Sequence, residues 1–357
     1  SQGNSPGAPW LGKSLKESAA AGQAAATKTD AIVHARAIFR TFFARPQAQA
    51  PQFTIRAVND LHPATSAAAQ APAQSPSITH YENFPVASWL CPPRLRAPIA
   101  ALYHFARTAD DIADEGDFSA EQRLEQLQRY GHDLQQLGTD AEAEMLACSA
   151  WPQVFAPLAR QMQTHQLPKP LMADLLSAFE QDVRMTASQT PYADMAQLID
   201  YCRRSANPVG RLLLHLYGVD HAQALTQSDA ICTALQLINF WQDLSQDLPR
   251  QRHYLPDADL ARHGIARSAV RAQASALTPA LQNLLAELHQ QARSLMEQGA
   301  PLVHQLPGRA GWELRLVVQG GLRVLEHLES MQGRNLYQRI KLRKQELPTL
   351  LWRAIRM

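Results

Sequence analysis

The chain has 357 residues, is 46% hydrophobic and carries a formal net charge of +2, with 34 basic residues set against 32 acidic ones. The basic residues are spread along the chain, so nothing in the composition points to a nucleic-acid partner. The four cysteines include no CxxC pair and form no cluster with histidines at zinc spacing. Reduced thiols in a cytoplasmic protein are the favoured interpretation. Because no stretch reaches the roughly 18 to 20 apolar residues of a membrane span, any membrane contact is expected to be peripheral, on the inner face.

The first 78 residues are rich in Ala, Gln, Ser and Pro and end in the low-complexity run 65–77. Such a composition buries too little apolar surface to offset the entropy of ordering. Residues 1–78 are therefore predicted to be a disordered extension, and residues 79–357 the folded domain. Within the extension, 31–45 has apolar residues at helical spacing with arginines between them. This stretch is a candidate membrane-surface helix or targeting segment, and a weakly helical tail or over-extended gene start is the alternative.

From residue 79 onward, apolar residues recur every three or four positions, which predicts helices almost throughout. The first runs over 94–114, Gly116 follows as a stop, and Ser119 is the expected N-cap of the next helix. No sustained alternation of apolar and polar residues is present, so the predicted fold is all-α, a single-domain helical bundle around a central cavity. Further helices are predicted at 121–137, 151–165, 170–186, 194–204, 206–217, 227–247, 278–299 and 309–331.

The first candidate site lies at the end of the predicted helix 94–114, where Asp110 and Asp114 are spaced i, i+4. One helical turn separates them, so both carboxylates point the same way, with Cβ atoms roughly 6 Å apart. Like charges so close destabilise a helix unless a cation lies between them. A hard divalent ion such as Mg²⁺ suits the arrangement, because it binds a few carboxylate oxygens together with water and substrate phosphate. Acids left at a solvated helix end are the alternative.

A second cluster lies about 130 residues further along the chain. Asn239, Asp243 and Asp247 follow one another at four-residue intervals, with Gln236 about one turn earlier. The predicted helix is apolar on its other sides, so this polar stripe is expected to face an internal cavity rather than solvent. Two such stripes facing each other across a bundle could hold several Mg²⁺ ions. A diphosphate bound to those ions becomes a good leaving group, and apolar walls would shield the resulting carbocation from water.

Over residues 79–357 these segments resemble the squalene/phytoene synthase family. The resemblance rests on a DxxxD motif, on a second Asn/Asp motif followed by a basic residue and Tyr-Leu-Pro, on a Tyr and Arg before the first motif, and on a Tyr-Cys loop before the second. It implies catalytic roles for eight residues, listed here: Tyr103, Arg107, Asp110, Asp114, Tyr201, Asn239, Asp243 and Asp247. The metal ligands among them would be Asp110, Asp114, Asn239, Asp243 and Asp247. Substrate-binding roles are implied for Arg107, Asn207, Gln236, Arg252 and Tyr254.

Within the family, the sequence is most similar to the bacterial hydroxysqualene synthases. The opening 80–88, the loop 205–211 and the segment 306–315 carry this similarity. Condensing members have a Ser- and Lys-bearing element where Glu82 and Asn83 stand, and usually an Arg where Gln242 stands. Both changes remove positive charge from the place where a second diphosphate would bind. Ordinary surface variation is the alternative at Glu82.

The reaction implied by the resemblance is Mg²⁺-dependent ionisation of presqualene diphosphate, rearrangement and capture by water, giving hydroxysqualene and diphosphate in squalene and hopanoid biosynthesis. The expected partners are a prenyl diphosphate lipid substrate, an upstream presqualene diphosphate synthase and a downstream hydroxysqualene-reducing enzyme. NADPH is not expected, in line with the lack of a Gly-rich dinucleotide motif. The candidates for positioning the water are Tyr103, Tyr201, Asn207 and Gln236.

Two alternative functions stay open at this point. One is a condensing synthase that makes presqualene or phytoene diphosphate from two prenyl diphosphates. The other is a non-catalytic assembly or binding relative, which would be expected to have lost metal ligands that this chain keeps. Outside the two motifs, Tyr337 and Arg339 lie where family members place a Tyr and basic groups near the diphosphate, with helix-surface roles as the alternative. Asp182 and Arg184 are interpreted as a local ion pair, with a pair in the upper part of the cavity as the alternative.

Overall fold

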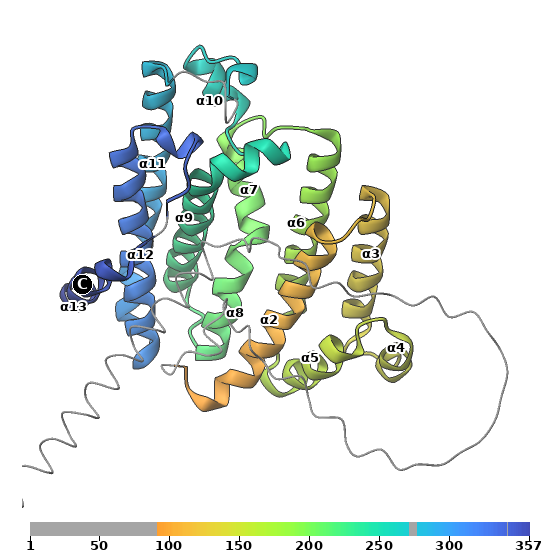
Figure 1. The fold of residues 1–357 in the computed structure, drawn as a ribbon. Helices are drawn as coiled ribbons and strands as arrows, with labels where there is room; N and C mark the ends of the chain where they lie inside the picture. The colour runs from red at the N-terminus through yellow and green to blue at the C-terminus, as the bar shows by residue number, and fades with distance from the viewer. Residues whose placement is uncertain (1–90, 271–276, 341) are drawn as a thin grey trace, which may run out of the picture.

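Helices make up the regular structure of the computed structural model, which describes residues 91–270, 277–340 and 342–357 (Figure 1). No strand occurs among these residues, so the all-α prediction is confirmed for them. The predicted boundary at residue 78, the helical stretch 31–45, Glu82 and Asn83 lie outside the described residues. No described helix combines the length and apolar character needed to cross a bilayer.

The bounds of the helices agree with the predicted ones to within two residues in most cases. The exception is α9, which begins five residues before the predicted start at 227. The structure also contains three helices that the sequence did not predict, α4, α10 and α13. In chain order the α-helices are α2 (Pro93–Asp114), α3 (Ala120–Gln136), α4 (Glu142–Cys148), α5 (Pro152–His165), α6 (Lys169–Ser188), α7 (Met195–Ser205), α8 (Asn207–Tyr217), α9 (Ala222–Asp247), α10 (Asp257–Arg262), α11 (Pro279–Gly299), α12 (Arg309–Met331) and α13 (Leu347–Arg356).

The connection between α2 and α3 shows how the chain fixes the end of the helix that carries the first motif. Gly116 has a φ of +79°, a left-handed conformation that favours glycine. The Ser119 hydroxyl accepts from the Gln122 N–H while the Gln122 side chain accepts from the Ser119 N–H, which is the predicted N-cap as a full capping box. The Arg123 guanidinium donates to the carbonyls of Ile112, Glu115 and Gly116 at 2.6–3.0 Å. The last turn of α2 is therefore held by α3.

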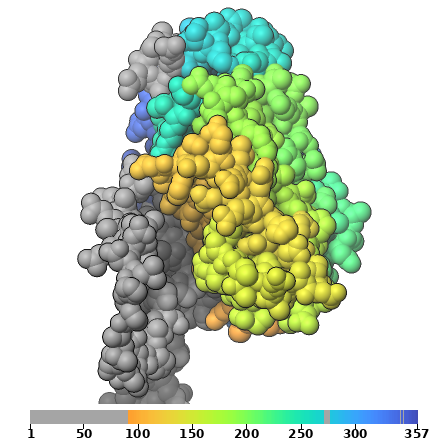
Figure 2. All heavy atoms as spheres, turned by 90° about the vertical axis from the view of Figure 1, so that its right-hand side faces the viewer, coloured from red at the N-terminus to blue at the C-terminus, as the bar shows by residue number. Residues whose placement is uncertain are grey.

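Apolar side chains form two buried clusters. One is centred on α9 and takes in side chains of α11 and α12, and the other is centred on α2 and takes in side chains of α3, α5 and α6. In Figure 2, atoms of α3 to α5 (golden to yellow-green) form much of the surface that lies over the second cluster. Within α9, every residue from Ile231 to Leu244 is buried except Gln236. The two predicted motifs therefore lie on helices that belong to different clusters.

Candidate functional site

At the end of α2, a single guanidinium contacts three carboxylates. Arg107 lies 3.0 Å from Asp110, 2.5 Å from Asp111 and 2.8 Å from Glu115. Asp111 and Glu115 were not among the predicted site residues. Burial raises the pKa of the Asp111 carboxyl to about 7, although Arg107 opposes the shift. Arg107 thus stabilises a concentration of acids that would otherwise repel one another along the helix.

The second motif lies on the inner side of the last turns of α9. Asn239 is 9% exposed, and Asp243 and Asp247 are each 1% exposed, as expected for a stripe that faces away from bulk solvent. Arg339 approaches Asp243 through two contacts, Nε to Oδ1 at 2.5 Å and a terminal nitrogen to Oδ2 at 3.1 Å. Only the second contact has hydrogen-bond geometry, so the two side chains form a close ion pair reinforced by one charge-assisted hydrogen bond. A buried negative charge is thereby neutralised by a residue almost a hundred positions away in sequence.

The ends of α2 and α9 are joined directly. The Arg252 guanidinium lies 2.5 Å from Asp114, and the Arg252 N–H donates to the Asp247 carbonyl at 3.1 Å. One arginine therefore contacts the last residue of the first motif with its side chain and the last residue of the second with its backbone. The structure places both carboxylate motifs at the same end of the bundle.

The oxygen ligands of the two motifs can be tested against the expected metal. Among the described residues, no three His, Cys, Asp or Glu side chains are grouped closely enough to hold one ion. Mg²⁺ is usually bound by one or two carboxylates and completes its shell with waters and substrate phosphate. The all-oxygen donors of each motif fit that mode of binding, provided that a diphosphate supplies the remaining ligands. Arg107, Arg252 and Arg339 already lie on the carboxylates that would receive the metal.

An aromatic cluster packs beside α9. The Tyr254 ring stacks on Phe240 with centroids 3.8 Å apart and an interplanar angle of 13°, and Tyr192 lies against both Tyr201 and Tyr254. The buried Tyr201 hydroxyl donates to Asp182 at 2.5 Å. Burial, followed by the Asp182 charge, holds the pKa of Tyr201 well above its usual value. Tyr201 is therefore a neutral hydrogen-bond donor at ordinary pH.

The interpretation of Asp182 and Arg184 as a local ion pair needs correction. Arg184 contacts Glu180 at 2.7 Å, whereas Asp182 accepts from Tyr201. Residues two apart on a helix point to different sides, while residues four apart share a side, so the spacing itself favoured Glu180. Asp182 thus links α6 to α7 through the Tyr201 hydroxyl.

Four further residues singled out from the sequence lie on or next to α2, α8 and α9. The Asn207 amide oxygen accepts from the Thr233 hydroxyl at 3.0 Å, so this side chain ties the start of α8 to α9. Gln236 is the partly exposed position of the stripe on α9, and Tyr103 is half-buried one turn before Arg107. Gln242, which stands where condensing relatives usually have Arg, is buried and donates to the Ile340 carbonyl at 2.6 Å. It thereby holds the segment that carries Arg339.

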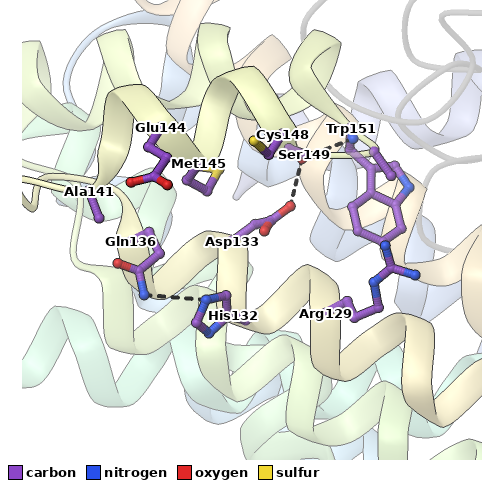
Figure 3. Close-up of a pocket in the computed structure, with 11 residues that line it drawn as sticks. Arg129, His132, Asp133, Gln136, Ala141, Glu144, Met145, Cys148, Ser149 and Trp151 are labelled. Atoms are coloured by element: carbon purple, nitrogen blue, oxygen red, sulfur yellow. Dashed lines mark hydrogen bonds between the residues drawn. The ribbon is translucent and has the colours of Figure 1, made fainter.

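A hollow of about 350 Å³ lies away from both motifs, between α3, α4 and the start of α5 (Figure 3). It contains none of the predicted site residues. The Ser149 hydroxyl donates to Asp133 at 2.6 Å, and the Gln136 amide lies 3.5 Å from the His132 ring, so polar groups of its lining bond to one another. The carboxylate chemistry is therefore concentrated at the ends of α2 and α9 rather than in this hollow.

An all-helical bundle with two acidic motifs at one end defines a class of enzymes that act on prenyl diphosphates. A family model described as squalene/phytoene synthase matches residues 78–346, and the chain belongs to that family. It is 36% identical to a hydroxysqualene synthase of Rhodopseudomonas palustris over 251 residues, covering 70% of this chain and 80% of the relative. A presqualene diphosphate synthase of Zymomonas mobilis is 26% identical over 275 residues, covering 77% of this chain and 88% of the relative.

A solved structure supports the same fold. The crystal structure of squalene synthase HpnC from Alicyclobacillus acidocaldarius matches with a TM-score of 0.61 and 33% identity, covering 71% of this chain and 90% of that one. A dehydrosqualene synthase structure matches with the same TM-score of 0.61 at 21% identity, which supports the fold alone.

Proposed function

We propose that this protein is a hydroxysqualene synthase. It ionises presqualene diphosphate with Mg²⁺, and water captures the rearranged carbocation to give hydroxysqualene and diphosphate. The observation that supports the proposal most strongly is the ion pair between Asp114 and Arg252. Because Arg252 also bonds to the Asp247 carbonyl, this contact joins the ends of the two helices that carry the acidic motifs. The similarity to hydroxysqualene synthases at 35–38% identity supports the choice of reaction.

The arginines at the site have a role that follows from their charge. The diphosphate leaves with the electron pair of the broken C–O bond, so negative charge grows on it as the bond lengthens. Bound Mg²⁺ would supply most of the compensating charge, held by the oxygens of Asp110, Asp114, Asn239, Asp243 and Asp247. Arg107, Arg252 and Arg339 provide donors beside those carboxylates and can turn from them to the phosphate oxygens.

The apolar part of the bundle protects the cation. Phe240 and Trp241 are fully buried and Tyr254 lies flat on Phe240, so the helix that carries the second motif packs into an apolar, aromatic core free of nucleophilic side chains at these positions. Ring faces stabilise a nearby positive charge, and a dry wall delays attack by water until the rearrangement is complete. The captured water loses one proton and becomes the hydroxyl of the product.

A direct assay separates this function from condensation. Purified protein with Mg²⁺ should convert presqualene diphosphate to an alcohol without NADPH, and ¹⁸O from labelled water should enter the product. Farnesyl diphosphate alone should give little or no product. Efficient formation of presqualene diphosphate from farnesyl diphosphate would instead favour the condensing synthase, a function carried by the more distant Zymomonas mobilis relative.

The reaction also indicates where the protein acts. Presqualene diphosphate must come from an enzyme that condenses two farnesyl diphosphates, and the alcohol must pass to an enzyme that reduces it. Substrate and product are both long prenyl chains with low solubility in water. We therefore propose that the enzyme acts in the cytoplasm with a peripheral contact on the inner face of the membrane.

A further inference from the structure

The C-terminal helix α13 presents an apolar face to solvent. Its inner side chains Leu347, Leu350 and Ala354 are buried on the bundle. On the outer side, Trp352 is 52% exposed and Ile355 is 65% exposed. These two residues are three apart on the helix and therefore neighbours on one face.

Two ion pairs fix α13 on α12, so the outer face is held in place. Arg353 contacts Glu326 at 2.5 Å, and Glu346 contacts Arg323 at 2.8 Å. An isolated ten-residue helix would be only marginally stable in water. Because α13 is already folded against the bundle, a partner would meet a preformed surface and no ordering cost would arise in this helix.

Positive charge is concentrated around the same helix. Residues 340–357 contain five basic residues, of which Arg353 is paired with Glu326, and one acid, Glu346, although the whole chain carries a net charge of only +2. That acid is already bonded to Arg323 and His327. On the outer face itself, the Arg356 guanidinium lies 3.8 Å from the centre of the Trp352 ring. The exposed apolar side chains are therefore flanked by basic groups.

We propose that the outer face of α13 docks on an anionic lipid bilayer. Trp352 and Ile355 enter the boundary between headgroups and acyl chains, where indole rings and aliphatic side chains are favoured. Arg343 and Arg356 contact the lipid phosphates, with their stems along the apolar surface. A docked enzyme lies on the bilayer that contains its prenyl substrate. This last step rests on the proposed function.

A second copy of the chain fits this face less well. Two exposed apolar side chains are too few for a stable interface, which needs on the order of 1,000 Å² or more of buried surface. A symmetric contact would also bring two basic segments together, and like charges across an interface weaken it. A negatively charged bilayer matches both the apolar and the basic character of the face.

Vesicle co-sedimentation of the full chain tests the docking, with phosphatidylcholine vesicles made with and without phosphatidylglycerol and no substrate present. The wild-type protein should bind the anionic vesicles, and binding should weaken as salt rises. The double variant Trp352→Ala/Ile355→Ala should lose binding by tenfold or more, since both inserted side chains are gone. Arg343→Gln/Arg356→Gln should bind about fivefold more weakly for each charge removed.

Phe118→Ala is the matched control, because Phe118 is 49% exposed but lies in the α2–α3 connection. It should bind vesicles as the wild type does. Thermal unfolding and turnover of detergent-dispersed presqualene diphosphate show whether each variant is folded, and they separate a failure of docking from a failure of the proposed function. If both α13 variants bind anionic vesicles as tightly as the wild type, the docking site lies elsewhere in the chain and the proposal is wrong. A dimer that dissociates in the α13 variants, together with absent vesicle binding, would also overturn it.

Discussion

Asp243 is a charged side chain with almost no access to solvent, and Arg339 is what makes its burial tolerable. Removing one partner of a buried ion pair typically costs about 3–5 kcal/mol, because the other charge stays buried without compensation. We expect Arg339→Gln to lower the free energy of unfolding by about that much in metal-free urea titrations. Adding Mg²⁺ with diphosphate should recover part of the loss.

The surface pair of Arg203 and Asp200 provides the control for this experiment, because both side chains are at least half exposed. Arg203→Gln should change the free energy of unfolding by about 1 kcal/mol or less. Equal effects of the two arginine substitutions would show that the contact between Arg339 and Asp243 contributes no more than a surface pair.

A substitution at Asp243 itself separates stability from catalysis. Asp243→Asn keeps the size of the side chain but removes the charge expected to bind Mg²⁺. We expect turnover to fall by on the order of 100-fold and the Mg²⁺ requirement to rise, as for other altered metal sites. Asp229→Asn, on the same helix and paired with Arg211 at 2.6 Å, should leave the Mg²⁺ dependence unchanged. An Asp243→Asn enzyme with wild-type turnover would exclude this carboxylate from the metal site.

His289 gives the fold a pH dependence that is separate from the site. It is buried on α11, and burial lowers its pKa from 6.5 to about 4. The ring therefore stays neutral in the folded state, while the unfolded chain takes up a proton below about pH 6.5. The contribution of His289 to the free energy of unfolding is therefore fully present above pH 6.5. It declines as the pH falls from 6.5 towards 4, by about 1.4 kcal/mol per pH unit.

Urea unfolding at pH 7 and pH 5 measures this contribution. The wild type should lose about 2 kcal/mol more than His289→Gln over that interval, since the variant has no proton to take up at this position. If both proteins lose the same amount, His289 is not the residue responsible for the acid sensitivity.

At the scale of elements, the sequence predicted the long helices well because each runs for several turns with an apolar stripe. Helices α4 and α10 were missed, since six or seven residues are too few to show a period of 3.6. Helix α13 was also missed, although Pro348 at its start and the spacing of Leu347, Leu350 and Ala354 were readable signals. Its position on α12 depends on ion pairs between residues more than twenty apart, which local periodicity does not reveal.

In the candidate site, the sequence predicted the contacts within a helix but not those between distant segments. Four-residue spacing placed Asp110 beside Asp114 and Asn239 beside Asp243, because it depends on a single helix. The contact of Arg252 with Asp114 and that of Arg339 with Asp243 join segments about 100 or more residues apart. Such contacts follow from packing of the whole bundle, so only the family resemblance pointed to these arginines.

Glycines at helix contacts allow a prediction about packing between elements. A Cβ added at Gly299 on α11 would lie 2.5 Å from the Gln227 carbonyl oxygen of α9, and backbone cannot move aside cheaply. We expect Gly299→Ala to destabilise the protein by about 1–3 kcal/mol. At Gly131 on α3, the nearest atom would be a Leu176 methyl at 3.5 Å, so Gly131→Ala should be neutral or stabilise the helix by up to about 1 kcal/mol. Thermal unfolding of the two variants distinguishes these outcomes, and a stable Gly299→Ala protein would show that α9 and α11 can separate freely.

At the scale of the whole molecule, the two motifs link two halves of the bundle. Asp110 and Asp114 belong to the helix at the centre of one apolar cluster, and Asp243 and Asp247 to the helix at the centre of the other. The contact between Arg252 and Asp114 joins these ends at 2.5 Å. A diphosphate bound through Mg²⁺ to carboxylates of both motifs would tie the halves together more strongly than either component alone.

This arrangement predicts that Mg²⁺ and diphosphate stabilise the protein cooperatively. Mg²⁺ alone must displace arginines from the carboxylates, and diphosphate alone meets a site rich in negative charge, so each should raise the unfolding temperature only slightly. Together they supply each other's ligands, and a bound ligand present at a free concentration of 100 times its dissociation constant adds about 2.7 kcal/mol of stability. Differential scanning fluorimetry with each component and with both measures the effect. Asp114→Asn should reduce the joint shift, while Asp229→Asn should not. If the shift in unfolding temperature with both components equals the sum of the two separate shifts, the two motifs bind their ligands independently.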